Sequence, residues 1–475
     1  MSAPQTDIAL VFPPVVMKDR YYRIARWVTV PPQGMAFLAA VARRAGYTVT
    51  VIDAVAENIT PENTVERIIA ANPRYVGLTG PTMVVHHAAD IARRVHDRLP
   101  GAPVIMGGPH MSAAPVETLE RYPEFDLGAF GEGEHTLVEL VKALDDKTPL
   151  NGIQGLLWRD NGAIVKNEPR PLIDDLDTLP LPAYDLLPQL TKFYQHVVIR
   201  VDRMPSASVL ISRGCAKGKC IFCSRDVYGG RVRMHSPEYC IEMFEMLIRN
   251  WGVRSINFED EDLLAFKPKM RRLCELMLER KLDLTWAVSG RVDMVDPDLL
   301  KLMKRAGCWH ISFGVESGDQ EILDRIRKNI TLDQVRHAVE VTKKAGITTK
   351  GFFMIGHPGE TPGTIQKTID FATSVDFDFF QVSYTVPLPG TELYRTASQW
   401  ADFNADWEEL NIWNPVFIPH GLTREILEKE SLRMFRAFYF RPKVLWKMFL
   451  RTFRTRHVLQ YLRDGFRFLG FLKSG

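Results

Sequence analysis

The sequence predicts an α/β protein with two consecutive β/α units and a helical C-terminal segment. Short apolar runs rich in β-branched residues alternate with amphipathic helical patterns twice along the chain. A stretch rich in proline and aspartate, residues 168–190, separates the two alternations. After about Tyr394 the pattern is helical, and its last part mixes aromatic with basic side chains.

The composition is that of a globular protein large enough for several cores. The chain has 475 residues, of which 46% are hydrophobic. Six are cysteines and residues 1–18 carry no signal-peptide pattern, so we expect a cytoplasmic protein without a disulfide framework. No uncharged apolar run reaches the about 20 residues of a membrane-spanning helix. The formal net charge is +3, yet residues 421–475 carry thirteen basic against four acidic side chains.

The first alternation predicts a doubly wound parallel sheet. Strands are expected at 8–12, 48–52, 75–79, 103–106 and 127–130, and helices at 34–44, 60–71, 84–99 and 116–122. Such sheets bind ligands beyond the carboxyl ends of their strands. The candidate ligand contacts are therefore the residues that follow these strands: Asp53, Thr79, Gly107, Gly108, Gly131, Glu132 and Gly133. The alternative interpretation of the glycines is that they only form tight turns.

The second alternation predicts a barrel or partial barrel. Strands are expected near 208–211, 255–258, 284–288, 310–315, 349–355 and 379–386. The chemistry of such a barrel lies at the carboxyl ends of the strands. Tyr384, on the last strand, is a candidate substrate contact from its position alone.

Three of the six cysteines lie within nine residues, directly after the first strand of this second unit. They are Cys215, Cys220 and Cys223. Three thiolates hold a metal centre but leave one coordination position open, as a substrate or cosubstrate requires. We expect Lys217 and Lys219 to favour the thiolate forms. The alternative is a zinc site completed by His235.

The other three cysteines, Cys240, Cys274 and Cys308, share no close spacing. Two of them lie in helical patterns. We interpret all three as buried structural thiols.

The cysteine loop resembles the cluster loop of the radical S-adenosylmethionine (SAM) superfamily. The resemblance implies that Cys215, Cys220 and Cys223 hold a [4Fe-4S] cluster whose fourth iron binds SAM. It further implies reductive cleavage of SAM to a 5′-deoxyadenosyl radical, with a reductant protein of the flavodoxin or ferredoxin type. The spacing here has one residue more than usual between the first two cysteines, which Gly218 can accommodate.

Other residues at the barrel's strand ends resemble the SAM contacts of the same family. Phe222 matches the position beside the adenine, and Glu259 with Asp260 matches the acidic pair that meets the amino group. Arg291, Glu316 and Ser317 match polar positions that face the carboxylate or the ribose.

The first unit resembles the Rossmann-like cobalamin-binding domain that is fused to one large class of radical SAM enzymes. The resemblance makes the candidate contacts after the first-unit strands a cobalamin site; a flavin site or an empty site is the alternative. The Asp-x-His-x-x-Gly motif is absent, so we do not expect His110 to bind cobalt. The resulting division is 1–150 cobalamin-binding domain, 151–200 linker, 201–395 radical SAM core with a partial (β/α)6 barrel, and 396–475 basic helical region.

This combination resembles the family that contains anaerobic magnesium-protoporphyrin monomethyl ester cyclase and cobalamin-dependent methylases. It implies a radical SAM enzyme that modifies an unactivated carbon, with methyl transfer as the first hypothesis. The alternatives are a non-methylating oxidative cyclase or rearranging enzyme, and a cobalamin-based sensor with a structural metal loop.

The C-terminal segment 438–472 combines basic residues with aromatic ones such as Trp446, Phe449 and Phe453. This pattern suits an interfacial helix on anionic lipid, peripheral at the inner membrane, or else a helical lid with a solvated basic face. The first interpretation predicts a small hydrophobic or lipid substrate. No RNA-binding module is recognised, so we expect no nucleic-acid partner.

Overall fold

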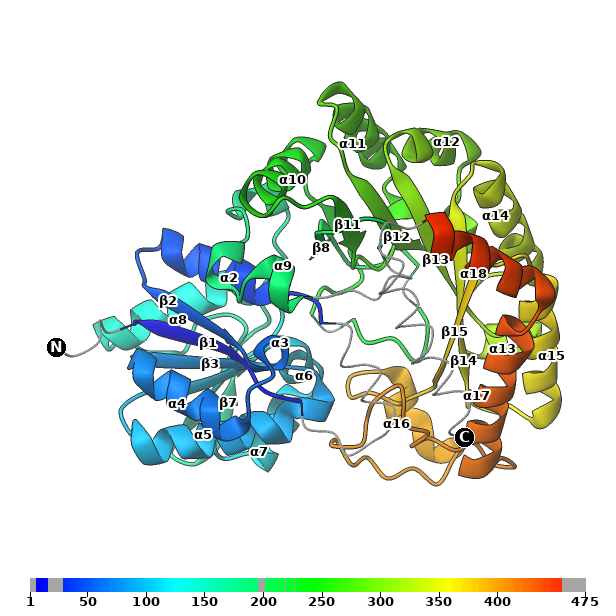
Figure 1. Ribbon diagram of the computed structural model, residues 1–475. Coiled ribbons are helices and arrows are strands. Elements are labelled where there is room, and N and C mark those ends of the chain that lie inside the picture. The colour runs from blue at the N-terminus through cyan, green and yellow to red at the C-terminus, as the bar shows by residue number, and fades with distance from the viewer. Residues whose placement is uncertain (1–5, 16–28, 195–200, 218, 226, 455–475) are drawn as a thin grey trace.

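The computed structural model describes residues 6–15, 29–194, 201–217, 219–225 and 227–454. Two α/β units lie side by side, and the C-terminal helices pack on the second (Figure 1). The predicted fold class is thereby confirmed, with each of the eleven predicted strands present within two residues of its expected bounds.

The first unit is a seven-stranded sheet in the order β2-β1-β3-β4-β5-β6-β7. Its strands are β1 (Ile8–Phe12), β2 (Val49–Asp53), β3 (Tyr75–Thr79), β4 (Val104–Gly107), β5 (Leu127–Ala129), β6 (Leu156–Asp160) and β7 (Ala163–Lys166). The first five are parallel, and β6 and β7 add an antiparallel hairpin to the edge. The sheet thus extends to Lys166, into the predicted linker 151–200, because the hairpin continues β5 without a crossover helix.

Helices cover both faces of this sheet (Figure 1). On β1, Ile8 and Leu10 enter the core cluster beneath one helical layer, and Ala9 and Val11 enter the other cluster. The helices are α2 (Gln33–Arg44), α3 (Ala54–Glu57), α4 (Pro61–Ala71), α5 (Val85–Arg98), α6 (Gly108–Ala113), α7 (Pro115–Arg121) and α8 (Gly133–Asp146). Thr60 caps α4 by accepting from the amide of Asn63.

The proline-rich strap crosses from the first sheet to the second. It contains the short helix α9 (Leu190–Phe193) and few other regular elements. The Asp177 carboxylate accepts from Ser236 N at 3.0 Å, and the hydroxyl of Tyr194 donates to Asp53 at 2.9 Å. These contacts tie the strap to both units.

The second unit is an open six-stranded parallel sheet, a half-barrel in the order β15-β14-β13-β12-β11-β8. Its strands are β8 (Ser206–Val209), β11 (Ser255–Phe258), β12 (Thr285–Gly290), β13 (Cys308–Glu316), β14 (Thr348–Ile355) and β15 (Phe379–Tyr384). Helices cover its convex face (Figure 1). They are α10 (Pro237–Trp251), α11 (Lys267–Glu279), α12 (Pro297–Arg305), α13 (Gln320–Arg325), α14 (Leu332–Lys344) and α15 (Pro362–Ser374).

The C-terminal part contains α16 (Glu392–Thr396), α17 (Arg424–Tyr439) and α18 (Pro442–Arg454). Phe438 is fully buried and Tyr439 donates its hydroxyl to the carbonyl of Phe380 at 2.7 Å. The predicted interfacial segment 438–472 therefore begins too early, because its first two residues belong to the barrel core. Residues 455–475, including Leu459, Phe466, Phe468 and Phe471, lie outside the described residues. Within the described part of the chain, no helix is long and apolar enough to span a bilayer.

Candidate functional site

The cysteine loop is closed at its base by a small hairpin. Strand β9 (Ser212–Arg213) pairs antiparallel with β10 (Arg233–Met234), so the chain leaves and returns at the same place. Gly214 has φ +91°, and a Cβ there would lie 2.5 Å from the carbonyl oxygen of Arg231. Only glycine fits this position without a backbone shift.

The middle of the loop is anchored to the half-barrel. The amide of Ile221 donates to the carbonyl of Ile326 at 3.1 Å, and the amide of Leu393 donates to the carbonyl of Ile221 at 2.8 Å. The loop is therefore held at both ends and in its middle. Gly218 lies outside the described residues.

The three loop cysteines are free thiols that influence one another. Cys215 and Cys220 are half-buried and Cys223 is exposed at the rim. The surrounding protein raises the pKa of Cys223 to about 11, and the charges of Cys220 and Cys215 add to that rise. A cluster bound here would replace these protons with iron and so offset the charges of the thiolates.

The zinc alternative finds no fourth ligand. His235 pairs through Nδ1 with Asp177 at 3.0 Å, and its ring stacks on Tyr239. Among the residues that the structure describes, no three His, Cys, Asp or Glu side chains converge on one ion. A cubane cluster is larger than one ion, so its three thiolates need not converge on a point. Cys240, Cys274 and Cys308 are fully buried, as expected of structural thiols.

The cations beside the cysteines differ from those predicted. Lys217 and Lys219 are exposed, and neither is among the main influences on the pKa of Cys220. Burial raises the pKa of Cys220, while the charges of Lys328 and Arg291 oppose that rise. Lys328 is buried and its Nζ lies 2.6 Å from Oε1 of Glu316. Sequence reasoning missed Lys328 because it lies more than one hundred residues after the loop, in a turn without a motif.

The two acidic residues predicted to meet SAM lie at the end of β11 and differ in their surroundings. Oε1 of Glu259 accepts from Ser208 Oγ at 2.7 Å and from Asn257 Nδ2 at 2.6 Å. Asp260 is buried and accepts from the amides of Ile211 and Ser212, which enter the cysteine loop. Burial raises the pKa of Asp260 to about 8 although Ser212 donates to it.

The remaining predicted SAM contacts lie at the ends of β12 and β13 and on the cysteine loop. Arg291 donates to Asp293 at 2.9 Å and to the carbonyl of Lys328 at 3.0 Å. The hydroxyl of Ser317 accepts from the amide of Asp319 at 3.1 Å. The charges of Arg291 and Glu316 both influence the pKa of Cys220. The ends of β12 and β13 therefore lie near the cysteine loop.

Phe222 lies next to Cys223 in the chain, and its ring centroid is 6.4 Å from that of His357. His357 is fully buried after β14, and its Nδ1 lies 3.0 Å from the hydroxyl of Thr385. Its neutral ring extends the aromatic side of the site.

A cavity of about 350 Å³ lies at the carboxyl ends of β1, β3, β4 and β5. Six of the seven predicted cobalamin contacts line it: Thr79, Gly107, Gly108, Gly131, Glu132 and Gly133. Asp53 is not among the lining residues. It caps α3 by accepting from Ala56 N at 3.0 Å, and burial raises its pKa to about 6.

Glycines and apolar side chains form most of the wall of this cavity, among them Met35, Phe37 and Leu38. Gly108 has φ +85°, and a Cβ there would lie 2.1 Å from Oγ1 of Thr79. Gly131 has φ +79°, which also favours glycine. Gly108 is therefore required by its backbone conformation and by its contact with Thr79, and Gly131 by its backbone conformation, as the turn interpretation also expects.

Buried charges join this cavity to the cysteine loop. Arg213, two residues before Cys215, donates to Oε1 of Glu132 at 2.7 Å and also bonds Glu134. Arg233, its neighbour across the hairpin, donates to both oxygens of Glu132 at 2.9 Å. All four side chains are at most 5% exposed, and Glu132, Glu134 and Arg213 line the cavity.

Two family models match the chain. The radical SAM superfamily matches residues 209–372, and the B12 binding domain matches residues 24–141. The first covers the cysteine loop and most of the half-barrel. The second covers β2 to β5, of which β3, β4 and β5 border the glycine-lined cavity.

Relatives match over nearly the whole chain. An uncharacterized methyltransferase of Pyrococcus horikoshii is 35% identical over 442 residues, 93% of this chain and 94% of its own. The anaerobic magnesium-protoporphyrin IX monomethyl ester cyclase of Cereibacter sphaeroides is 29% identical over 454 residues, 94% of this chain and 72% of its own.

Solved structures share the fold at low sequence identity. The radical enzyme OxsB, with aqua-cobalamin and SAM bound, is 16% identical with a TM-score of 0.75, covering 99% of this chain and 71% of its own. The methyltransferase TsrM of Kitasatospora setae, with cobalamin and a [4Fe-4S] cluster, is 20% identical with a TM-score of 0.67, covering 83% and 75%.

Proposed function

This chain belongs to the radical SAM superfamily, among the members that carry a B12-binding domain, and we propose that it is a cobalamin-dependent methyltransferase. The observation that carries the proposal is the buried link through Arg213 between the glycine-lined cavity and the three-cysteine loop. An enzyme that uses two cofactors on one substrate needs their sites fixed relative to each other.

The residues of the loop fit a cluster. Cys215, Cys220 and Cys223 would hold the [4Fe-4S] cluster, and Lys328 with Arg291 would offset the negative charge of the thiolates. We assign the SAM contacts to the strand-end residues Phe222, Glu259, Asp260, Arg291, Glu316 and Ser317. When bound, the cluster and SAM would supply the 5′-deoxyadenosyl radical, and cobalamin would supply a methyl group.

The residues of the first cavity fit part of a large cofactor. Thr79 and the four glycines would contact cobalamin through a surface of backbone atoms, and Glu132 would remain paired with Arg213. His110 cannot serve as a cobalt ligand without losing its bonds, because Nδ1 meets Thr82 and Nε2 meets Thr118, each at 3.1 Å. We therefore expect cobalamin without a protein histidine ligand, and Asp53 as an outer contact.

A second candidate function is an oxidative cyclase that transfers no methyl group. The observation in its favour is the cyclase relative that matches 94% of this chain. The sensor alternative has no such support, because the relatives reported above are named as enzymes. Either reaction needs an electron donor, for which we propose a reductant protein of the flavodoxin or ferredoxin type.

For the substrate we propose a hydrophobic molecule, with delivery from an anionic membrane surface. The support is an apolar face of α18: Leu445, Trp446 and Phe449 are 46%, 60% and 52% exposed. Lys443 and Lys447 are paired with Asp376 at 3.0 Å, so the apolar face carries most of this support. Vesicle co-sedimentation should fall in Trp446→Asp and not in Ile412→Asp, which places the same charge on a 41% exposed apolar residue outside α18. Equal sedimentation of the two variants would contradict membrane delivery.

The test of the enzyme reaction is anaerobic reconstitution with iron, sulfide and cobalamin. Reduced enzyme with SAM should release 5′-deoxyadenosine, and Cys220→Ala should not. Cys274→Ala, which removes a buried thiol outside the loop, should retain the activity. Absence of deoxyadenosine from the wild-type protein, with zinc in place of iron, would refute the proposal.

A further inference from the structure

Lys328 and Glu316 form a buried ion pair beside the cysteine loop. The two residues are 8% and 7% exposed, and Nζ of Lys328 donates to Oε1 of Glu316 at 2.6 Å. Burial alone would lower the pKa of Lys328, but the carboxylate of Glu316 raises it above its usual value, so the lysine keeps its charge. Because a buried ion pair adds little net stability, the pair points to a function for its charges.

The turn that carries Lys328 is bonded to the cysteine loop. The carbonyl of Ile326 accepts at 3.1 Å from the amide of Ile221, which directly follows Cys220. Two residues later, the carbonyl of Lys328 accepts from Nη2 of Arg291 at 3.0 Å. The turn is therefore held to the loop on one side and to the end of β12 on the other.

The carboxylate partner is placed by an irregular end of β13. The pairing of β13 with β14 shifts register between Gly314 and Glu316, and Glu316 has φ +73°. Such a bulge re-aims a side chain, and a residue other than glycine is strained at this φ. A Cβ on Gly314 would lie 2.7 Å from Oε1 of Glu316 and 2.9 Å from Nζ of Lys328. The ion pair thus occupies space that glycine leaves free.

The charge of Lys328 acts on two of the three loop cysteines. Burial raises the pKa of Cys220, and the neighbouring charge with the largest influence on that pKa is Lys328, which lowers it. Glu316 has the smaller and opposite influence. Burial also raises the pKa of Cys223; Lys328 opposes that rise, while Glu316 is not among the main influences there. The pair therefore acts on the loop as a net positive charge.

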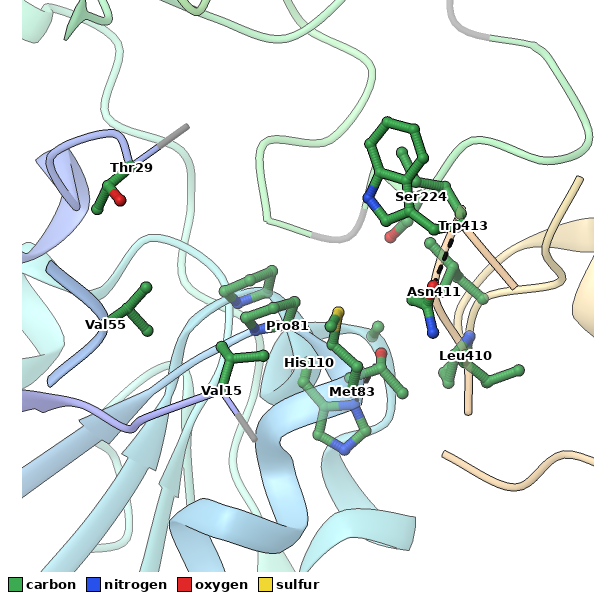
Figure 2. Close-up of a pocket in the computed structure, with 16 residues that line it drawn as sticks. Val15, Thr29, Val55, Pro81, Met83, His110, Ser224, Leu410, Asn411 and Trp413 are labelled. Carbon is green, nitrogen blue, oxygen red and sulfur yellow. Dashed lines mark hydrogen bonds between the residues drawn. The ribbon is translucent and has the colours of Figure 1, made fainter. Parts of the chain in front are cut away.

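The other end of the loop is exposed. Ser224, directly after the exposed Cys223, lines a cavity of about 390 Å³ between the two units, as does Trp413 (Figure 2). This part of the cavity wall is held to the half-barrel, because the amide of Tyr384 donates to the carbonyl of Ile412 at 3.0 Å. Water and salt screen charges on the exposed side, whereas Lys328 acts from the buried side, where screening is weak.

We propose that Lys328 raises the reduction potential of the iron–sulfur cluster that the loop cysteines hold. The inference rests on the proposed function for the presence of the cluster. Reduction adds one electron, supplied by the reductant, and makes the site more negative by one charge. A buried positive charge favours the more negative state. Lys328 is thus a positioning residue that acts through the thiolates.

The test is a redox titration of the reconstituted holoenzyme without SAM, followed by the electron paramagnetic resonance signal of the reduced cluster. At the wild-type midpoint potential, the ratio of reduced to oxidised cluster should fall at least tenfold in Lys328→Met, which is about 59 mV for a one-electron couple. Lys328→Arg keeps the charge, so its midpoint should lie closer to the wild type than that of Lys328→Met. Iron content is measured on every sample.

The matched control is Lys350→Met, which removes another buried lysine of the half-barrel. Lys350 is 5% exposed and lies near the start of β14, away from the carboxyl ends of the strands. Its midpoint should equal that of the wild type.

A second variant guards against a loss of folding, because Lys328→Met leaves Glu316 buried without its cation. The double variant Lys328→Met/Glu316→Gln removes both charges. Its midpoint should also lie below that of the wild type, because Lys328 has the larger influence on the loop.

Three results would overturn the role of Lys328: wild-type midpoints in Lys328→Met and the double variant, an equal shift in Lys350→Met, or a shift in Lys328→Arg as large as that in Lys328→Met. Deoxyadenosine release after addition of SAM is measured on the same samples. If the midpoint depends on Lys328 and the wild type releases no deoxyadenosine, the reaction proposal fails and the role of Lys328 remains. If deoxyadenosine is released and the midpoint ignores Lys328, only that role fails. Zinc in place of the cluster in the wild type would overturn both.

Discussion

The two cofactor regions are built by different means. The cavity of the first unit combines glycines at strand ends, with Gly108 and Gly131 at positive φ, with apolar side chains such as Met35 and Leu38. The cysteine loop is shaped by side chains, with three thiols beside the buried pair Lys328 and Glu316. A large cofactor is met by a wide, mostly apolar wall, and a small charged one by groups that compensate its charge.

Arg213 is where the two kinds of construction meet. It precedes the cysteine loop, yet its partners Glu132 and Glu134 belong to the first cavity. We therefore expect substitutions in the cysteine loop to have the largest effect, substitutions in the first cavity a weaker one, and substitution of Arg213 an effect between the two.

The largest effect is expected where side chains alone make the site. Cys220→Ala should reduce bound iron and deoxyadenosine release to background, because two thiolates leave an iron of the cluster without a protein ligand. Iron content and product are measured after reconstitution. Retention of cluster absorbance in this variant would show that Cys220 is not a ligand.

The link should give the next largest effect. Arg213→Met removes the ion pairs of Arg213 with Glu132 and Glu134. Glu132 keeps Arg233 and the amide of Ile173, but Glu134 loses its ion pair while buried, which should cost about 3–5 kcal/mol of unfolding free energy. Arg43→Met removes an exposed pair with Asp185 and should cost about 1 kcal/mol or less. Urea unfolding measures both. Equal midpoints for the two variants would contradict a structural role for the buried network.

Substitutions in the cavity of the first unit should have weaker and more selective effects. Gly108→Ala strains a positive φ and crowds Thr79, at a cost of about 1–3 kcal/mol, and should lower bound cobalamin while leaving iron content unchanged. Gly46 has φ +95° but no neighbour within 4 Å of an added Cβ. Gly46→Ala therefore controls for backbone strain. Equal cobalamin loss in both variants would contradict the assignment of the glycine-lined cavity to cobalamin.

The effect that is smallest near pH 7, and grows only as the pH is lowered, concerns His110, beside the first cavity. Burial lowers the pKa of His110 to about 4, below the value of about 6.5 in an unfolded chain. Below pH 6.5 the unfolded state therefore binds a proton that the folded state does not. The free energy of unfolding falls as the pH is lowered from 6.5 to 4, by up to about 1.4 kcal/mol per pH unit. The stability difference between wild type and His110→Gln should shrink with this slope; a constant difference would contradict a neutral, buried imidazole.

Local patterns were sufficient for the strands, the cysteine loop and the glycines at the strand ends. They follow from alternation, spacing and turn chemistry, which are properties of neighbouring residues. The positions that differ depend on distant partners. Lys328 reaches Cys220 from another turn, and Phe438 is buried because it meets Phe380 of β15.

Partnerships also decide details that residue type leaves open. Asp260 was predicted for its place at a strand end, and the structure shows its carboxylate engaged by the entry of the cysteine loop. Lys217 is close to the thiols in sequence but exposed in the fold. Sequence position gives the candidate, and only packing reveals what its charge meets.

The most direct test of the central claim quantifies 5′-deoxyadenosine and S-adenosylhomocysteine in one reaction of reduced, cobalamin-loaded enzyme with SAM and an apolar substrate extract. A methyltransferase should release both products. Deoxyadenosine without S-adenosylhomocysteine would contradict methyl transfer and favour the oxidative cyclase.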